Sequence, residues 1–279
     1  MHAFLRFPGN RRRALTLSYD DGVIFDKRLV EILNENGIKC TFNLNSGFYG
    51  NGPRRLTRED AVALFKNSGH EVALHGEHHY SLAEVDTASA VRDIMNDRAD
   101  HERTYGTIVR GLAYANGSYN DEVVNLLRTC GVAYARTVSS TEKFDIPTDF
   151  LRWHPTAHHG NKNLMALCDK FLDAPNERWI WQKRPRLFYL WGHSYEFNDN
   201  DNWEIIEEFA KKMGGHEEVW YATNMEVYEY VTAFNNLVYS YDGKTVYNPS
   251  ATDVWLCRFG KDLFVPAGKT VILEEIGQQ

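Results

Sequence analysis

The chain has 279 residues, 43% of them hydrophobic, so it can bury the core of one barrel-sized domain or of one domain with a small appendage. Its net charge of −7 argues against a general binder of nucleic-acid backbones, and no segment approaches the roughly 18 apolar residues of a membrane span. Four scattered cysteines show neither a zinc-ribbon spacing nor a disulfide framework. With no apolar signal run at the start, we expect a cytoplasmic protein, or a secreted one if a signal peptide has been removed.

Short β-rich runs alternate with longer helical patterns from Ala14 to about Thr232, which is typical of parallel strands joined by crossover helices. Residues 14–19 predict the first strand, and Asp26 opens a helix that Gly37 stops. Further strands are predicted at 40–45, 71–74, 108–113, 133–137, 151–154, 186–191 and 219–223. About eight βα units predict an α/β fold of the TIM-like (β/α) barrel type. The barrel is expected to be distorted, because residues 139–149 show no clear helix.

The pattern changes after about Asn235. Residues 238–247 carry an Asp242-Gly243 turn signal between alternating residues, and residues 253–273 continue in short β-like runs. No repeat or Pro/Ser-rich linker intervenes. We therefore predict a barrel over residues 1–234 and a small C-terminal β appendage over 235–279 that packs onto it.

Polar residues that could carry chemistry follow the predicted strands. They are Asp20, Asp21, His75, His79, residues 114–117, His154 and His193. In a (β/α) barrel these positions lie at the C-terminal rim, where active sites are built from the loops that follow the strands. The sequence therefore predicts that these side chains converge.

Two imidazoles and one carboxylate are an ordinary ligand set for catalytic zinc with an open position for water. His75 and His79 have the i, i+4 spacing that faces one way on a helical turn, and Asp21 supplies the carboxylate. Taken alone, Asp20-Asp21-Gly22 is also typical of an ordinary turn, and the two histidines are also typical of a surface cluster. The metalloprotease pattern HExxH does not fit, because Glu77 is the third residue of the segment that starts at His75, not the second, and would point away from the metal.

Four segments resemble, in order and approximate spacing, the motifs of the polysaccharide deacetylase family, which is carbohydrate esterase family four and includes nodulation-type chitooligosaccharide deacetylases. They are SYDDG at 18–22, CTFNLN at 40–45, GHEVALH at 69–75 continuing to His79, and LWGH at 190–193. The resemblance runs from about Leu15 to Tyr228. It implies a distorted (β/α) barrel and a metal-dependent hydrolase that removes an N-acetyl or similar acyl group from a sugar or glycan.

The resemblance also implies a role for each matching residue. Asp20 corresponds to the general base, Asp21, His75 and His79 to the metal ligands, and His193 to the general acid. The expected metal is zinc, with cobalt, nickel or manganese as alternatives. In such a site the metal polarises the acyl carbonyl and activates water, while the base takes a proton and the acid protonates the departing amine.

The sequence departs from the family pattern at two places. The motif that ends Pro-Tyr-Gly in the family is Ala115-Asn116-Gly117 here, which can keep a main-chain N–H donor for the oxyanion. The arginine that partners the base in the family is replaced by Ala113, which leaves Arg110, Arg136 and Arg152 as candidates to hold Asp20 ionised.

Several residues near these motifs are predicted to bind substrate. They are Tyr114, Asn116, Gly117, Trp191 and Glu196, the last two as a sugar-stacking ring and a hydroxyl partner, with core packing as the alternative for Trp191. The family's fourth motif is only loosely echoed by Asp149 and Trp153. The additional histidines His154, His158 and His159 could line the pocket, bind metal or belong to a loop, and the loop reading is preferred.

The leading hypothesis is hydrolysis of a non-peptide carbon–nitrogen amide bond, with a carbohydrate or another small amide as the partner. A related hydrolase acting on a cyclic amide or ureido compound is one alternative. A catalytically silent carbohydrate-binding protein is another, but binding alone requires neither the base Asp20 nor the acid His193. We expect neither a nucleic-acid nor a membrane partner, and homo-oligomerisation stays open.

Overall fold

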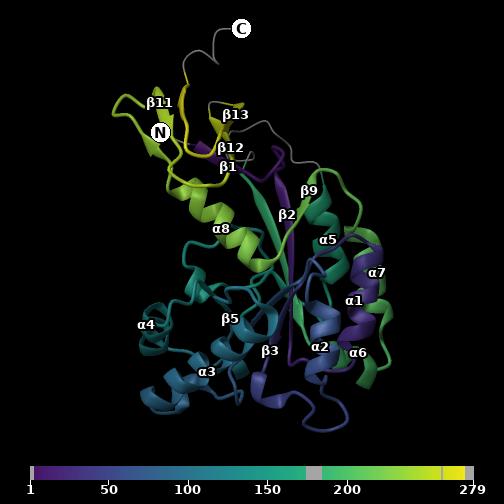
Figure 1. The fold of residues 1–279 in the computed structure, drawn as a ribbon. Coiled ribbons are helices and arrows are strands. Elements are labelled where there is room, and N and C mark those ends of the chain that lie inside the picture. Colours follow the sequence, from purple (N-terminus) through teal and green to yellow (C-terminus); the bar gives the residue numbers. More distant parts are fainter. Residues whose placement is uncertain (1–2, 174–183, 259, 274–279) are drawn as a thin grey trace.

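The computed structural model describes residues 3–173, 184–258 and 260–273. Within these ranges eight strands form one curled parallel sheet with the order β6-β5-β4-β3-β2-β8-β7, and β9 pairs with β2 (Figure 1). The strands are β2 (Arg13–Asp20), β3 (Thr41–Leu44), β4 (Glu71–Leu74), β5 (Gly111–Ala113), β6 (Tyr134–Arg136), β7 (Ala157–His158), β8 (Arg186–Gly192) and β9 (Val219–Tyr221). The predicted α/β class is confirmed.

The two edges of this sheet are joined through the segment that precedes and includes β7. Trp153 N–H donates to Ala135 O, and Thr137 N–H donates to Trp153 O, both at 3.0 Å, while β7 pairs with β8. Strand β2 pairs with two other strands at different points along its length. Its residues 13–15 pair with β9 and its residues 18–20 pair with β3, so the ring of strands is irregular there. The sheet therefore forms a distorted barrel, as predicted.

One predicted strand is wrong. Residues 150–152, which overlap the strand predicted at 151–154, form a 3-10 turn, and Trp153 makes a single bridge to β6. The reason is a local cap: Asp149 Oδ1 accepts the N–H of Leu151 at 3.0 Å, which curls the backbone before it can extend. No helix forms over residues 139–149, in agreement with the sequence.

Helices cover the outside of the sheet (Figure 1). Their bounds are α1 (Asp26–Glu35), α2 (Arg58–Phe65), α3 (Thr87–Tyr105), α4 (Asp121–Thr129), α5 (Leu164–Leu172), α6 (Ser194–Asp199), α7 (Glu204–Met213) and α8 (Asn224–Asn235). Leu15, Leu17 and Tyr19 of β2 share one apolar cluster with residues of α1, α2, α5 and α7, and a second cluster joins α3 and α4 to β4 and β5. The alternate residues of β2 are Thr16, Ser18 and Asp20, so this period of two turns its polar side chains into the barrel.

Helix α8 lies between the barrel and the small C-terminal strands (Figure 1). A capping box of Thr223 and Glu226 starts the helix. Its first residue, Asn224, enters the base of the barrel, where it accepts from Thr16 Oγ1 at 2.8 Å and donates to the Tyr189 hydroxyl. The base of the barrel is therefore closed by polar contacts from α8.

Two small antiparallel sheets pack beyond α8. They are β1 (Ala3–Arg6) with β12 (Val254–Arg258) and β13 (Lys261–Val265), and β10 (Val238–Tyr239) with β11 (Thr245–Tyr247) and β14 (Thr270–Ile272). The hairpin predicted around Asp242-Gly243 is present as β10–β11. The sequence did not indicate that β1, from the start of the chain, would pair with β12; the boundary at residue 234 stays a prediction. Among the described residues, no helix combines the length and apolar character needed to cross a bilayer.

Candidate active site

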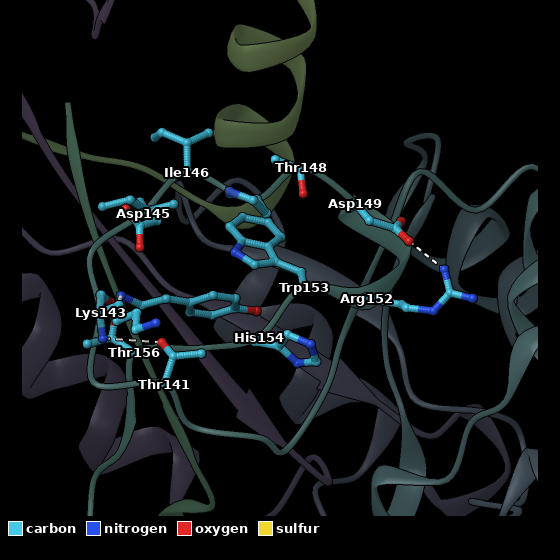
Figure 2. A pocket seen from close by; sticks show the side chains of 13 residues that line it. Thr141, Lys143, Asp145, Ile146, Thr148, Asp149, Arg152, Trp153, His154 and Thr156 are labelled. Carbon is cyan, nitrogen blue, oxygen red and sulfur yellow. Dashed lines mark hydrogen bonds and ion pairs between the residues drawn. The ribbon is translucent and has the colours of Figure 1, made fainter. Parts of the chain in front are cut away.

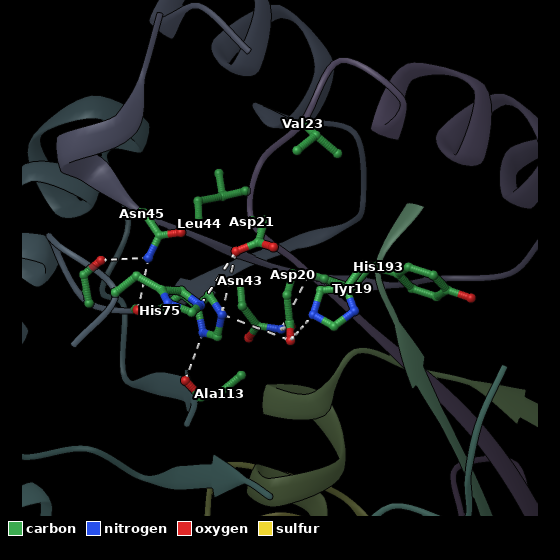
Figure 3. A network of polar contacts seen from close by, with 12 residues as sticks. Tyr19, Asp20, Asp21, Val23, Asn43, Leu44, Asn45, His75, Ala113 and His193 are labelled. Carbon is green, nitrogen blue, oxygen red and sulfur yellow. Dashed lines mark hydrogen bonds and ion pairs between the residues drawn. The ribbon is translucent and has the colours of Figure 1, made fainter. Parts of the chain in front are cut away.

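Three strand ends bring the predicted catalytic residues together at the C-terminal rim of the barrel (Figure 3). Asp20 is the last residue of β2 and Asp21 follows it, His75 comes directly after β4, and His193 comes directly after β8. Because parallel neighbours end on the same side, these side chains converge although they are far apart in the sequence. The structure thus places all four within one cluster.

Asp21, His75 and His79 present ligand atoms that all lie within 4.8 Å of one another. Asp21 Oδ1 is 3.8 Å from His75 Nε2 and 3.6 Å from His79 Nε2. The predicted helical turn over residues 75–79 is wrong: Gly76 and His79 have positive φ values of 81° and 57°, and the segment is a bent loop. The histidines meet because the loop folds back, not because of helical spacing.

The ring of His75 is held in the form that a metal ligand requires. Its Nδ1–H donates to the carbonyl of Ala113 at 2.9 Å, which leaves Nε2 as the lone-pair nitrogen (Figure 3). That Nε2 atom is buried and has no hydrogen-bond partner. A buried acceptor without a partner is costly, and a cation shared with Asp21 and His79 would satisfy it. The residues present therefore fit a divalent metal.

Asp20 is buried and held by two donors. Its Oδ1 accepts from Asn43 Nδ2 at 2.8 Å, and its Oδ2 accepts from the fully buried guanidinium of Arg136. Burial raises the pKa of this carboxyl, but Arg136 and the nearby histidines outweigh it and hold the pKa below its usual range. Asp20 is therefore ionised and directed toward the cluster.

The structure resolves which of the three candidate arginines contacts Asp20. Arg136 makes the contact, and its guanidinium also lies 4.4 Å from the ring centroid of Trp191. Arg110 pairs with Glu229, and Arg152 pairs with Asp149 and Asp121 outside the cluster. Arg136, in the neighbouring strand β6, therefore makes the contact that the family's arginine would make from the position of Ala113.

His193 lies on the other side of Asp20, between two carboxylates. Its Nε2 is 3.7 Å from Asp20 Oδ2, and its Nδ1 is 3.3 Å from Glu196 Oε1. Burial lowers the pKa of this imidazole, yet the hydrogen bond to Glu196 and the surrounding carboxylates raise it overall. The next residue, Ser194, donates to buried Asp26 at 2.5 Å and so fixes the segment to the start of α1.

Glu196 also receives two of the additional histidines. Its Oε2 is 3.1 Å from His158 Nε2 and 2.7 Å from His159 Nε2. Gly160 N–H donates to His158 Nδ1 at 3.1 Å, so the proton of that ring sits on Nε2 and points at the carboxylate. Burial lowers the pKa of His159 to about 4. These three side chains therefore have the composition of a second possible metal site and lie close to one another.

The predicted substrate-binding residues fall into different surroundings. Tyr114 is buried and donates its hydroxyl to Leu151 O at 2.8 Å, so its side chain belongs to the core and only its main chain faces the rim. Asn116 is exposed, with a φ of 57°, and Gly117 leaves no room for a side chain because Val138 packs over it. The Trp191 ring lies against Arg136 and the residue is 9% exposed, so most of it is buried at the rim.

His154 belongs to a different hollow from His158 and His159. A cavity of about 400 Å³ opens beneath residues 141–149 and is lined by Trp153, Tyr189 and His154, with the Arg152–Asp149 pair at its side (Figure 2). His154 Nδ1 lies 2.7 Å from the Thr137 hydroxyl. Asp149 and Trp153, the loose echo of a fourth motif, therefore lie along this cavity and do not contact His193.

Sequence reasoning missed two contributors to the site. Asn43, which holds Asp20, lies within the strand quoted for the resemblance, but an amide inside a strand gives no signal of its own. Asp97 accepts the N–H of His75 and of Gly76 at 3.1 and 3.0 Å from the middle of helix α3, where no motif marks it. Both contacts join residues of different secondary-structure elements, which a pattern within one sequence does not reveal.

Comparison with known proteins gives a consistent fold. A protein of Mycobacterium smegmatis described as a polysaccharide deacetylase matches 84% of this chain and 95% of its own at 17% identity, with a TM-score of 0.58. A mutant of a Bacillus anthracis pseudoenzyme of carbohydrate esterase family 4, with restored activity, matches 81% and 70% at 14% identity and a TM-score of 0.50. No curated protein matches the sequence.

The sequence itself matches a family profile over residues 8–135, and that profile is described as Polysaccharide deacetylase. The matched part contains Asp20, Asp21, His75 and His79 but ends before His193, whose place in the site comes from the structure. Residues 8–135 of the chain are therefore similar to the polysaccharide deacetylase family, in agreement with the resemblance of its motifs.

Proposed function

We propose that the chain is a metal-dependent hydrolase that removes an N-acetyl or similar acyl group from a sugar or glycan. The observation that carries this proposal is the arrangement at the rim: three ligand-type atoms within 4.8 Å, with an ionised carboxylate and an imidazole beside them. Similarity to the family supports the acyl-sugar substrate class. A metal bound there, zinc in the first instance, would supply a Lewis acid that polarises the acyl carbonyl and lowers the pKa of water.

The ligand residues differ in how firmly they are held. His75 is buried and its ring is fixed by Ala113 O, whereas His79 and Asp21 are partly exposed and face the open side. Asp21 has a φ of 84°, which turns its carboxylate toward both imidazoles. The three residues would hold the metal on one side and leave the solvent side for substrate and water.

Asp20 is the proposed general base. Its Oδ2 is 3.9 Å from His75 Nε2, so it lies beside the metal ligands without being one of them. Arg136 and Asn43 keep it ionised and fix its orientation, and an ionised carboxylate can take the proton of the attacking water.

His193 is the proposed general acid. With its pKa raised, the imidazole keeps its proton close to neutral pH and can donate it to the departing amine nitrogen. Glu196, which was predicted to meet a sugar hydroxyl, is instead surrounded by His158, His159 and His193. We assign it the role of orienting His193 and stabilising its protonated form.

The residues proposed to contact the substrate lie at the same rim of the barrel. The main-chain N–H of Asn116 is the candidate oxyanion donor, and the exposed part of Trp191 is the candidate surface for a sugar ring. Because Asn116 replaces an aromatic residue of the family pattern, we expect a smaller or differently shaped glycan than a long chitin chain.

The proposal is tested by metal analysis of the purified protein combined with acetate release from a panel of N-acetylated sugars, with and without zinc or cobalt. Asp20→Asn should abolish release while the metal stays bound, and His75→Ala should lose both. Asp199→Asn and His216→Ala are matched controls, because both side chains lie outside the cluster. Unchanged release in Asp20→Asn would refute the assigned base.

Two alternatives give different results in the same experiment. Bound metal without acetate release from any sugar would favour a hydrolase of cyclic amide or ureido compounds, which can be assayed by chromatography of the ring-opened carboxylate or, for a ureido group, by ammonia release. Sugar binding without release under any divalent metal would favour a catalytically silent binding protein. The ion pair of Asp20 with Arg136 argues against the silent form, because binding alone does not require a buried base.

A further inference from the structure

The loop that carries both proposed histidine ligands, residues 75–79, has no regular secondary structure and yet is held on two sides. We call it the ligand loop. Helix α3 packs along it and presents Asp93, Asp97 and His101, which are spaced four residues apart and therefore share one helix face. Their exposed fractions are 2%, 0% and 0%, so three ionisable side chains are buried against the ligand loop.

Asp97 binds the first half of the ligand loop. Its Oδ2 accepts the N–H groups of His75 at 3.1 Å and Gly76 at 3.0 Å, and its Oδ1 accepts the N–H of Ser46 at 2.8 Å. One carboxylate thus satisfies three main-chain donors from the loops that follow β3 and β4. Hydrogen bonds from N–H groups to a buried carboxylate are among the stronger ones in proteins.

Asp93 binds the second half. Its Oδ1 accepts the N–H of His78 at 2.8 Å and lies 3.0 Å from His78 Nδ1, while its main-chain carbonyl accepts the N–H of Glu77 at 3.3 Å. Gly76 has a φ of 81°, and a Cβ there would lie 2.3 Å from Asp93 Oδ2. The loop is therefore seated so closely on α3 that its second residue has to be glycine.

The segment after β3 holds the other side of the ligand loop. Asn45 Nδ2 donates to the carbonyls of His75 and Gly76 at 2.9 and 2.8 Å (Figure 3). Gly47 N–H donates to Glu77 O at 3.2 Å. Main-chain donors of the loop are thus bound by α3, and its acceptors are bound by residues 45–47.

Stability alone does not explain these acids. Aspartate is a poor residue for the middle of a helix, and burying a carboxylate costs free energy that a well-packed apolar side chain would not. His101 lessens this cost, because its Nε2 is 3.3 Å from Asp97 Oδ1 and 3.0 Å from Leu44 O. The Asp97–His101 pair thus binds main-chain groups of the ligand loop and of residues 44–46 without touching a ligand side chain, which is the arrangement that positioning of ligands requires.

We propose that Asp97 is a positioning residue for the metal centre: by binding the N–H groups of His75, Gly76 and Ser46, it holds the ligand loop in the shape that places His75 and His79 opposite Asp21. Asp93 holds the far end of the same loop. This inference rests on the proposed function, since it assigns the acids to the metal ligands described above. It predicts that α3 controls metal affinity although it supplies no ligand.

The test is metal affinity, measured by competition of zinc or cobalt with a chelating dye. Asp97→Asn keeps the size of the side chain but places an NH₂ group against main-chain donors. We expect its dissociation constant for zinc to rise about 10–100-fold, as for other partners of metal ligands. Asp100→Asn is the matched control, because Asp100 is on the same helix but pairs with Arg58 and Arg103, and its affinity should stay within about twofold of wild type, well below that range.

A second measurement separates positioning from general loss of fold. Hydrogen exchange of the metal-free wild type should show protected amides at Gly76 and Ser46, whose N–H groups donate to Asp97, and in Asp97→Asn these amides should exchange faster while amides of β2 and β8 keep their protection. Wild-type zinc affinity in Asp97→Asn would overturn the inference and leave the proposed function standing. If the wild type itself binds no metal, the proposed function and the positioning role both fail, whereas the exchange data still report whether Asp97 holds the loop.

Discussion

Substitution of Arg136 tests the proposed base most directly, because the structure gives Asp20 a single buried arginine partner among the described residues. Arg136 is fully buried, and its guanidinium donates to Asp20 Oδ2. Removal of one member of a buried ion pair costs about 3–5 kcal/mol, since the remaining charge loses its counter-charge in a poorly solvated place. For Arg136→Gln we expect the free energy of unfolding near neutral pH to fall by about 4 kcal/mol.

The same substitution should reduce catalysis. Without Arg136, burial disfavours the ionised carboxylate of Asp20 and one of its two orienting contacts is lost. General bases contribute about 10²–10⁴-fold to rate, so kcat/KM for acetate release should fall at least about 10²-fold. Arg136→Lys keeps a cation without the forked guanidinium, and its activity should lie between the two.

Arg152→Gln is the matched control, because the sequence offers Arg152 as an equal candidate but the structure places it at the surface with Asp149 and Asp121. Surface ion pairs contribute about 0–1 kcal/mol, so this variant should unfold within about 1 kcal/mol of wild type and keep its activity. Urea unfolding followed by circular dichroism and a coupled acetate assay measure both quantities. If Arg136→Gln loses no more stability or activity than Arg152→Gln, the reasoning about the base is wrong.

Three further predictions follow from groups around the site. Because Glu196 raises the pKa of His193, activity should persist above the usual pKa of histidine and fall as pH rises through the raised pKa. Glu196→Gln should move this alkaline decline of the pH–activity profile to lower pH. An unchanged profile would contradict the role of Glu196. Burial raises the pKa of Asp26 to about 7, so the free energy of unfolding of the metal-free protein should fall as pH rises from about 4 to 7, by up to about 4 kcal/mol. Asp26→Asn should flatten this pH dependence in urea unfolding. The same pH dependence in wild type and variant would contradict the raised pKa of Asp26. Elemental analysis should give one metal ion per chain and not two, because Gly160 N–H keeps the proton of His158 on Nε2. Two ions would show that a second group of side chains, His158–His159–Glu196 or Glu77–His78–Asp93, also binds metal.

The sequence predicted the fold and the converging residues because both follow from local rules. Period-two alternation, together with glycine and aspartate at the ends of apolar runs, indicated the strands, and parallel strands have to bring their C-terminal ends to one rim. Asp20 and Asp21 were therefore found beside each other at the end of β2, with His193 at the end of β8. The strand at 151–154 failed because the Asp149 side chain competes for the backbone, which alternation alone does not reveal.

The contacts that set the chemistry could not be predicted in the same way. Arg136 reaches Asp20 across 116 positions of sequence, and no local pattern distinguishes it from Arg110 or Arg152. The i, i+4 spacing of His75 and His79 suggested a helix, but the true constraint is the binding of the ligand loop by α3 and residues 45–47. Partners of this kind depend on tertiary packing, which one sequence does not display.

The pairing of β1 with β12 has a consequence for the order in which the polypeptide folds. Ala3 lies opposite Arg258, and the pair Arg6–Asp262 joins positions 256 apart in the chain. Strand β1 is therefore made long before β12, and more than 200 residues must be added before its partner exists. Contacts of such long separation form late, and an unpaired edge strand is open to pairing with other chains. The nascent barrel must accordingly fold beside an unpaired strand, and synthesis of β12 and β13 completes the small sheet.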